Sequence, residues 1–375
     1  MRRFFVIILL FALFFSLTDQ YYSQSRKHYT ITGKVLDKGT GKPIPLANVF
    51  LDGTTFGAAT DNSGKYEIKN VVRGSYKIVV SMIGYEQKDV NIQLMDSATI
   101  VVNFKIATLS YKLEEINITT ERDYDWIDDY EFFKKNFLGT SNNSEECSIM
   151  NKGVLEFIKS DEFKLKAKAS EPLKILNKAL GYIVYFDMKD FEILNDDEIN
   201  YYGTIHFEEL IPNNKDEKLK WEKKREEAYK GSLRHFLTSL CKGKLQENGF
   251  YCYKVNFPKW EDLRNRKYLD PYLSEIIERI SPVERVLQFN KYIMVTYMEE
   301  WEERDFLAYR NYHGSKIFQR LDFQTSWVKL PYGFAMFDLN GNVVDNYKSV
   351  KVYGYWAWQK IADLMPTDYV PRELN

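Results

Sequence analysis

The sequence contains few of the residues from which metal sites and disulfide frameworks are built. Its 375 residues include 3 cysteines and 4 histidines. Cys147, Cys241 and Cys252 fit neither a zinc-ligand spacing nor a CxxC motif, and they allow at most one disulfide. Such a disulfide would join Cys241 to Cys252 if a helix packs on the following strand; buried free thiols are the alternative.

An excess of charge of one sign is also absent. Lysine and arginine together number 52, aspartate and glutamate number 53, and the net charge is −1. A surface dedicated to nucleic acid or to anionic lipid needs a strong positive field. The composition therefore argues against nucleic acid as a partner.

Familiar catalytic motifs are missing from the chain. The sequence has no GxSxG elbow, no HExxH, no Rossmann glycine set, and no Gly-Lys pair followed by the serine or threonine of a P-loop. We therefore predict neither a set of catalytic residues nor a cofactor.

Apolar runs of membrane-spanning length are missing as well. Arg2 and Arg3 precede an apolar run from Phe4 to Leu17. This run is shorter than the ~20 residues of a spanning helix but fits the core of a signal peptide, which has roughly 7–15 residues. We predict a signal peptide over residues 1–23, with an uncleaved membrane anchor as the alternative. The mature chain would then have no transmembrane segment and would reside in the periplasm or at the cell surface, with peripheral attachment to the outer membrane as one option.

Aromatic residues, in contrast, are abundant. The chain has 27 tyrosines, 25 phenylalanines and 7 tryptophans, a composition that favours β structure. Over residues 28–106, short alternating segments are separated by turn residues, such as the tight turn Asp61-Asn62-Ser63-Gly64, in which Gly64 takes a positive φ. About seven such strands predict a β-sandwich.

The same segment resembles a known family. Its matching motifs are Thr32-Gly33-Lys34-Val35, Pro45-Leu46-Ala47-Asn48-Val49, Gly57-Ala58-Ala59-Thr60-Asp61, Gly64-Lys65-Tyr66, Gly74-Ser75-Tyr76 and Ile83-Gly84-Tyr85. They are similar to those of the carboxypeptidase regulatory-like domain, which has a transthyretin-like fold. The resemblance implies an accessory unit, found beside peptidases and at the front of outer-membrane receptors, with no catalytic residues.

The rest of the chain has a mixed pattern. We predict a linker over residues 107–131 and a mixed α+β domain over residues 132–375. Lys215 to Tyr229 is predicted to form a charged helix with a solvated face, and Ser232 to cap a second, amphipathic helix. A last helix is predicted from Tyr355 to Leu364, ending at Pro366. The segment Ala228–Leu237 resembles uncharacterised envelope proteins of the Bacteroidetes type, a family that implies no activity.

Two groups of residues are candidates for ligand binding. Arg225, Tyr229, Arg234 and His235 form the densest polar group and suit an anionic or sugar ligand, although a network at a helix end would also explain them. Trp356 and Trp358 could stack on sugars; the alternative is that they belong to the core.

A zinc site is the alternative that would make the protein an enzyme. His206 and Glu209 have the HxxE spacing of the first two ligands in metallocarboxypeptidases, and His313 lies about the right distance downstream for the third. Because an HxxE arises easily by chance, and because this one reads as part of a strand, our first prediction is no metal.

The predicted function is that of a non-enzymatic, exported cell-envelope protein. The sandwich would act as an interaction module, and the second domain would bind an envelope protein or a glycan. The alternatives are a zinc-dependent, carboxypeptidase-like hydrolase and a remnant or partner of a TonB-dependent outer-membrane receptor.

Overall fold

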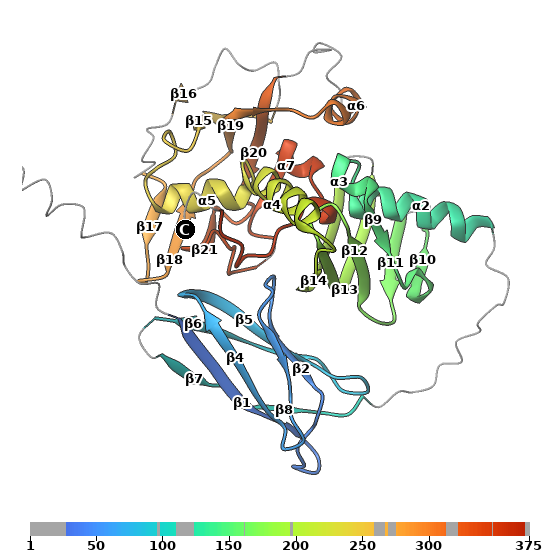
Figure 1. Cartoon of the computed structure of the whole chain (residues 1–375). Coiled ribbons are helices and arrows are strands. Elements are labelled where there is room, and N and C mark those ends of the chain that lie inside the picture. The colour runs from blue at the N-terminus through green and yellow to red at the C-terminus, as the bar shows by residue number, and fades with distance from the viewer. Residues whose placement is uncertain are drawn as a thin grey trace, which may run out of the picture.

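The chain forms a β-sandwich that lies against a larger α+β part (Figure 1). The predicted signal peptide and His313 lie outside the described residues. The computed structural model describes residues 28–95, 98–109, 124–160, 162–195, 198–258, 267–268, 275–312, 322–346 and 348–371.

The N-terminal sandwich consists of two four-stranded sheets that enclose one hydrophobic core. One sheet has the order β4-β1-β7, with β8 also paired to β1, and the other has the order β3-β2-β5-β6. The sandwich is confirmed, with eight strands in its described residues rather than about seven, because Gly57–Ala59 pairs as a further strand. The strands are β1 Tyr29–Asp37, β2 Asn48–Leu51, β3 Gly57–Ala59, β4 Lys65–Val71, β5 Gly74–Ser81, β6 Lys88–Leu94, β7 Thr99–Val101 and β8 Phe104–Ile106.

Alternation along the strands places the core. Tyr66 and Ile68 in β4 and Ile78 and Val80 in β5 all point inward and are buried, as their period of two predicts. Gly64 has φ +71°, and a Cβ there would lie 2.6 Å from the carbonyl oxygen of Val35. This turn therefore requires glycine, as predicted from the sequence.

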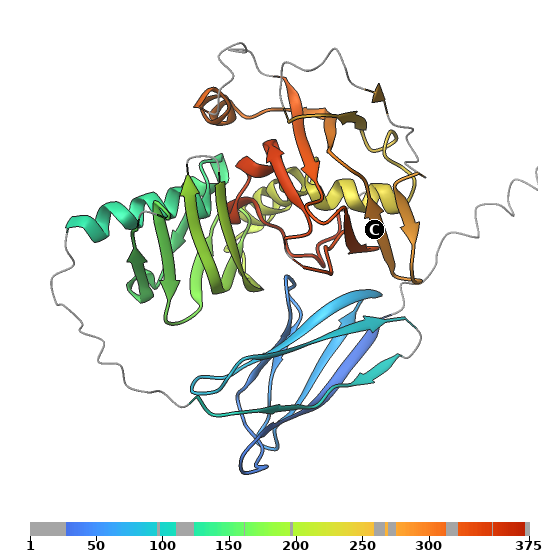
Figure 2. The ribbon, with the colours of Figure 1, turned by 180° about the vertical axis from the view of Figure 1, so that it is seen from behind.

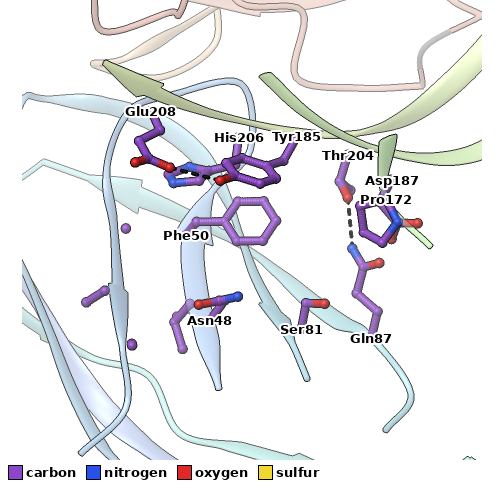
Figure 3. Close-up of a pocket in the computed structure, with 14 residues that line it drawn as sticks. Asn48, Phe50, Ser81, Gln87, Pro172, Tyr185, Asp187, Thr204, His206 and Glu208 are labelled. Carbon is purple, nitrogen blue, oxygen red and sulfur yellow. Dashed lines mark hydrogen bonds between the residues drawn. The ribbon is translucent and has the colours of Figure 1, made fainter. Parts of the chain in front are cut away.

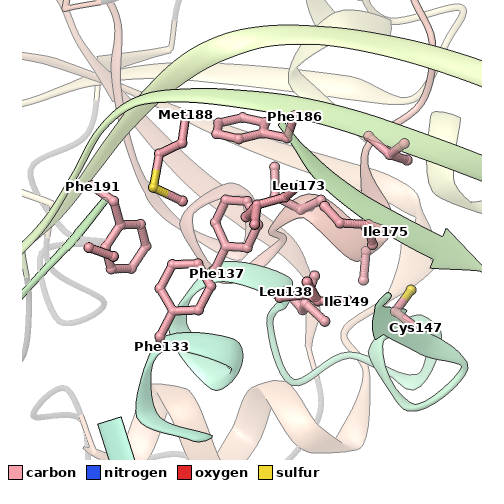
Figure 4. Close-up of a cluster of buried hydrophobic side chains, with 14 of the residues drawn as sticks. Phe133, Phe137, Leu138, Cys147, Ile149, Leu173, Ile175, Phe186, Met188 and Phe191 are labelled. Carbon is pink, nitrogen blue, oxygen red and sulfur yellow. The ribbon is translucent and has the colours of Figure 1, made fainter. Parts of the chain in front are cut away.

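The first half of the α+β part is a six-stranded antiparallel sheet with helix α2 (Tyr124–Leu138) packed on one face (Figure 2). Helix α2 begins inside the segment predicted as a linker. Phe133 and Phe137 of α2 meet Phe186 and Phe191 of the sheet edge to face, at centroid distances of 4.7–5.9 Å (Figure 4). The sheet has the order β10-β11-β13-β12-β9, with β14 paired to β13; its strands are β9 Cys147–Ile149, β10 Leu155–Ile158, β11 Leu165–Ala169, β12 Leu173–Asn177, β13 Tyr182–Asn195 and β14 Glu198–Glu209.

Two helices connect the two halves of this part. Helix α4 (Lys215–Tyr229) has the predicted bounds, and α5 (Leu233–Cys241) begins after Ser232, whose side chain accepts a hydrogen bond from the His235 amide. Short helical segments elsewhere are α3 (Asn142–Glu145), α6 (Arg304–Tyr312), α7 (Tyr355–Trp358) and the 3₁₀-helices Lys152–Val154 and Ile361–Asp363.

The second half packs α5 between two sheets. Phe236 and Leu240 of α5 are buried in a core of their own, separate from that of the first half. The three cysteines are free thiols, and burial raises the pKa of each to about 12. The sheets are β16-β15-β19-β20-β22 and β17-β18-β21, built from β15 Phe250–Val255, β16 Lys267–Tyr268, β17 Ile277–Arg279, β18 Glu284–Gln288, β19 Tyr292–Trp301, β20 Phe323–Lys329, β21 Phe334–Asp338 and β22 Lys351–Gly354.

The prediction of one long final helix is wrong. Helix α7 ends at Trp358, Gln359 is extended, and a short 3₁₀-helix follows at Ile361–Asp363. Trp356 packs into the core of the second half, whereas Ile361 and Ala362 pack into the core of the first half. The chain bends after α7 because these side chains belong to two different cores.

None of the helices in the described part of the chain combines the length and apolar character needed to span a bilayer.

Candidate functional site

The loop between β2 and β3 fixes the sandwich to the rest of the chain. Gly53 donates its amide to the carbonyl of Ile205 at 2.7 Å, and Phe207 donates to the carbonyl of Thr54 at 3.0 Å. On the other side of the loop, Thr367 donates to the carbonyl of Gly53 at 2.8 Å. The loop thus lies like a short strand between the edge of β14 and the C-terminal segment.

A second contact forms at the start of β5. The Ser75 hydroxyl donates to Glu284 Oε1 at 2.8 Å, and the Ser75 amide donates to Asp338 Oδ2 at 3.3 Å. The side chain of Asn340 also donates to the carbonyl of Arg73 at 3.1 Å. Because buried polar groups favour one set of partners, two such contacts hold the sandwich in one orientation.

A pocket of about 390 Å³ lies beside the first contact, with walls from both units. The sandwich contributes residues of β2, β3 and β5, and the α+β part contributes the outer face of β13 and β14, as Figure 3 shows. The volume is within the range of roughly 300–1,000 Å³ that is typical of small-molecule sites. The pocket is therefore the candidate functional site.

Aromatic rings line the inner end of the pocket. His206 lies beside Tyr185, at a centroid distance of 6.3 Å and an interplanar angle of 23°, and its ring centroid is 5.1 Å from that of Phe50 of the sandwich. Gly57 permits this approach, because a Cβ there would lie 3.1 Å from His206 Cε1. The pocket thus has a continuous aromatic surface that belongs to both units.

Polar groups line the remaining wall. The Tyr185 hydroxyl donates to Glu208 Oε2 at 2.9 Å, and Gln87 Nε2 donates to Thr204 Oγ1 at 2.9 Å (Figure 3). Lys189 Nζ, just outside the wall, lies 2.7 Å from Asp187 Oδ2. Burial lowers the pKa of His206, so its ring is neutral at pH 7.

Asp52 gives the junction a pH dependence. Its Oδ1 accepts a hydrogen bond from the Ile205 amide at 2.7 Å, and burial raises the pKa of its carboxyl to about 6. The folded protein then holds this proton more tightly than the unfolded chain does. The contribution of Asp52 to stability is therefore greatest at low pH and falls as pH rises through the window from about 4 to 6.

Asp52→Asn is expected to remove this dependence, because an amide oxygen still accepts from Ile205 but does not ionise. The stability of the variant relative to the natural protein should rise by about 1–3 kcal/mol between pH 4 and pH 7. Urea unfolding at the two pH values measures it. A relative stability that stays constant across this window would contradict the assignment.

In the structure, the side chains of the predicted polar group contact other parts of the protein itself. Arg225 donates to the carbonyls of Leu180 and Gly181 at 2.7 and 3.1 Å. Arg234 donates to the carbonyls of Asn340, Pro366, Thr367 and Tyr369. Tyr229 and His235 are buried against each other, and burial lowers the pKa of His235 to about 4.

The two tryptophans are also buried. Trp356 Nε1 donates to the carbonyl of Gly231 at 2.6 Å, and Trp358 Nε1 donates to Thr140 Oγ1 at 3.0 Å. Their exposed fractions are 7% and 2%, so neither ring offers a face to solvent in this structure. Ligand contact by any of these six predicted residues stays a prediction.

The predicted metal ligands do not converge within the described residues. His206 and Glu209 are three apart on β14 and so point to opposite faces, and Glu209 Oε1 lies 3.2 Å from Arg225 Nη1. Among the described positions, no three His, Cys, Asp or Glu side chains are grouped to hold a metal ion. With His313 outside those positions, the zinc site stays an untested prediction.

Sequence reasoning did not single out Phe50, Tyr185 or Thr204 as site residues. The sequence did contain one indication of this site. The segment Ile183–Met188 alternates, which puts Tyr185 and Asp187 on the strand face opposite the buried Val184 and Phe186. An aromatic and a carboxylate on an outward face suggest a covering partner. Nothing local identifies Phe50 as the ring that meets this face.

Comparisons with known proteins match parts of the chain. No curated protein matches it. Similar solved structures include a cohesin–X-dockerin complex from Acetivibrio cellulolyticus, 27% identical over 20% of this chain and 51% of that chain with a TM-score of 0.18. The minor pilin GBS52 of Streptococcus agalactiae is 16% identical over 23% of this chain and 47% of that one, with a TM-score of 0.20. The TIE protein of Bacillus anthracis is 11% identical over 50% of this chain and 32% of that one, also with a TM-score of 0.20.

The chain spans about half the length of the cohesin–X-dockerin chain that it matches. Given these TM-scores, we base no functional conclusion on the solved structures. The informative match is to a family model, that of the CarboxypepD_reg-like domain, which covers residues 31–118. The sandwich at the N-terminus of this chain is therefore a carboxypeptidase regulatory-like domain.

Proposed function

We propose that this chain is a non-catalytic binding protein of the bacterial cell envelope, and that its junction pocket binds a glycan. The observation that supports the proposal is the composition of the pocket wall, in which aromatic rings and hydrogen-bonding groups face the same space. A pyranose ring has an apolar C–H face that stacks on aromatic rings and a rim of hydroxyls that needs donors and acceptors.

The pocket offers both kinds of contact. Tyr185 and Phe50 provide aromatic surface, while Asn48, Ser81 and Glu208 provide polar groups at the rim. Hydrogen bonds already orient Gln87 and Thr204 across the pocket and Tyr185 and Glu208 within one wall, which lowers the entropy lost when a ligand binds. The regulatory-like domain would then act as one wall of a binding site, which suits its accessory role in the family.

Affinity electrophoresis of the purified protein tests the proposal. The gels contain mannan, xyloglucan, pullulan, polygalacturonate or alginate. Ala59→Trp fills the pocket from the sandwich side, because Ala59 is exposed, lines the pocket and lies opposite Asn48. Retardation by at least one polysaccharide is expected, with an affinity at least about tenfold lower in Ala59→Trp, which corresponds to ~1.4 kcal/mol.

The matched control is Val101→Trp, which adds the same ring to an exposed strand position that does not line the pocket. This variant should bind as the natural protein does. Equal binding by Ala59→Trp, or no retardation by any polysaccharide, would overturn the proposal. Cleavage of a retained polysaccharide, seen as released reducing ends, would instead show an enzyme.

A further inference from the structure

We infer that the junction pocket selects neutral saccharides and rejects acidic ones. This inference rests on the proposed function and goes further by assigning the chemical class of the ligand. The feature that carries it is the sign of the charge on the pocket wall.

The charged side chains that line the pocket are all acidic. Asp187 and Glu208 both belong to the wall, and the lining residues include neither lysine nor arginine. His206, the remaining titratable base in the wall, is neutral at pH 7 because its burial lowers the pKa of the ring. A ligand carboxylate that enters this space would meet the Glu208 carboxylate and no lysine or arginine among the lining residues.

Lys189 and Lys174 both contact residues of the lining, although neither belongs to the lining itself. Lys189 Nζ lies 2.7 Å from Asp187 Oδ2 and donates to Gln87 Oε1 at 2.8 Å, so the charges of Lys189 and Asp187 offset each other and Glu208 is the acidic group of the wall that carries the inference. Lys174 Nζ lies 5.7 Å from the ring centroid of Tyr185 and its side chain is exposed outside the lining.

The same carboxylates favour a neutral sugar. A hydroxyl that donates to an ionised carboxylate forms a stronger hydrogen bond than one that donates to a neutral acceptor. Glu208 already accepts one such bond, from the Tyr185 hydroxyl at 2.9 Å, which fixes the carboxylate at the edge of the aromatic surface. A pyranose stacked on Tyr185 would bring its hydroxyls to this edge. The wall thus attracts hydroxyls and repels carboxylates with the same groups, which is selection by an attractive and a repulsive element together.

Chemically matched polysaccharides test the inference. Each neutral polysaccharide of the panel (mannan, xyloglucan and pullulan) is oxidised to carboxylates at its free C6 hydroxyls, and polygalacturonate and alginate are carboxyl-reduced to their neutral forms. The linkage is unchanged within each pair, so only the charge differs. For every pair that is retained in either form, the neutral form is expected to bind at least about tenfold more tightly at low salt.

The variant Glu208→Gln removes the acidic charge of the wall that is not paired with a lysine, and it retains a hydrogen-bonding group of similar size. In this variant the neutral and acidic forms of each pair are expected to bind within about twofold of each other. An acidic form that binds the natural protein as tightly as its neutral partner would overturn the inference, and so would a preference that the variant leaves intact. Binding with the wrong charge preference contradicts this inference alone, whereas an absence of binding to every form contradicts the proposed function.

Discussion

Replacing Arg234 by alanine is expected to lower the free energy of unfolding by about 3–5 kcal/mol. The guanidinium donates four hydrogen bonds, of 2.5 to 3.1 Å, to the carbonyls of Asn340, Pro366, Thr367 and Tyr369. Burial lowers the pKa of Arg234. Alanine leaves all four carbonyls without this donor.

Urea denaturation measures the loss, and Arg304→Ala is the matched control because Arg304 is exposed in the first turn of α6. Arg234→Lys is expected to recover only a minor part of the stability, since one ammonium cannot reach carbonyls that lie in several directions. Hydrogen exchange should be accelerated most at Thr367 and Tyr369. A loss below about 1 kcal/mol would contradict the role assigned to this arginine.

The buried ion pair of helix α6 is the second position where a large effect is expected. Arg310 Nη1 lies 2.7 Å from Glu302 Oε2, and the two side chains are 1% and 0% exposed. Burial raises the pKa of Glu302 to about 7 even with the arginine present. Arg310→Met removes the only partner of opposite charge that is found for Glu302 in the described residues, and it should cost about 3–5 kcal/mol at pH 8.

A double-mutant cycle separates this pair from general damage. Glu302→Gln/Arg310→Met leaves no buried charge at either position and is expected to be more stable than Arg310→Met alone at pH 8. The loss of stability in Arg310→Met should become smaller as pH falls toward 5, because the Glu302 carboxyl is then protonated and neutral in the folded variant. A deficit that is independent of pH would show that the cost arises from packing rather than from charge.

Local sequence patterns were sufficient to predict many of the helices, strands and turns. Ser232 caps α5, Lys215–Tyr229 is a helix, and Gly64 turns with a positive φ, because each depends on hydrogen bonds or steric limits within a few residues. The sandwich followed from its alternating strands and from the family resemblance. These are the features for which neighbouring residues carry the information.

The pocket could not be predicted in the same way, because its parts meet only across the junction. His206 is 156 positions from Phe50, and strand alternation tells only that it shares a face with Thr204 and Glu208. Arg234 and His235 show the opposite difficulty, in which a local pattern has a distant explanation. Their dense polar group on a helix suggested a ligand. In the folded chain the distant segment 366–369 supplies the acceptors for Arg234 instead.

The loop between β2 and β3 places a constraint on the order of biosynthesis. Gly53 and Thr55 lie in the N-terminal sandwich, yet they are held by Thr367 and Asp368, more than 300 positions further along the chain. A growing polypeptide can complete the core of the sandwich once Ile106 has been made, but it can hold the sandwich through these contacts only after Thr367 and Asp368 have been added. A chain interrupted before Thr367 would therefore fold its sandwich but leave the loop between β2 and β3 without the partners that hold it on this side.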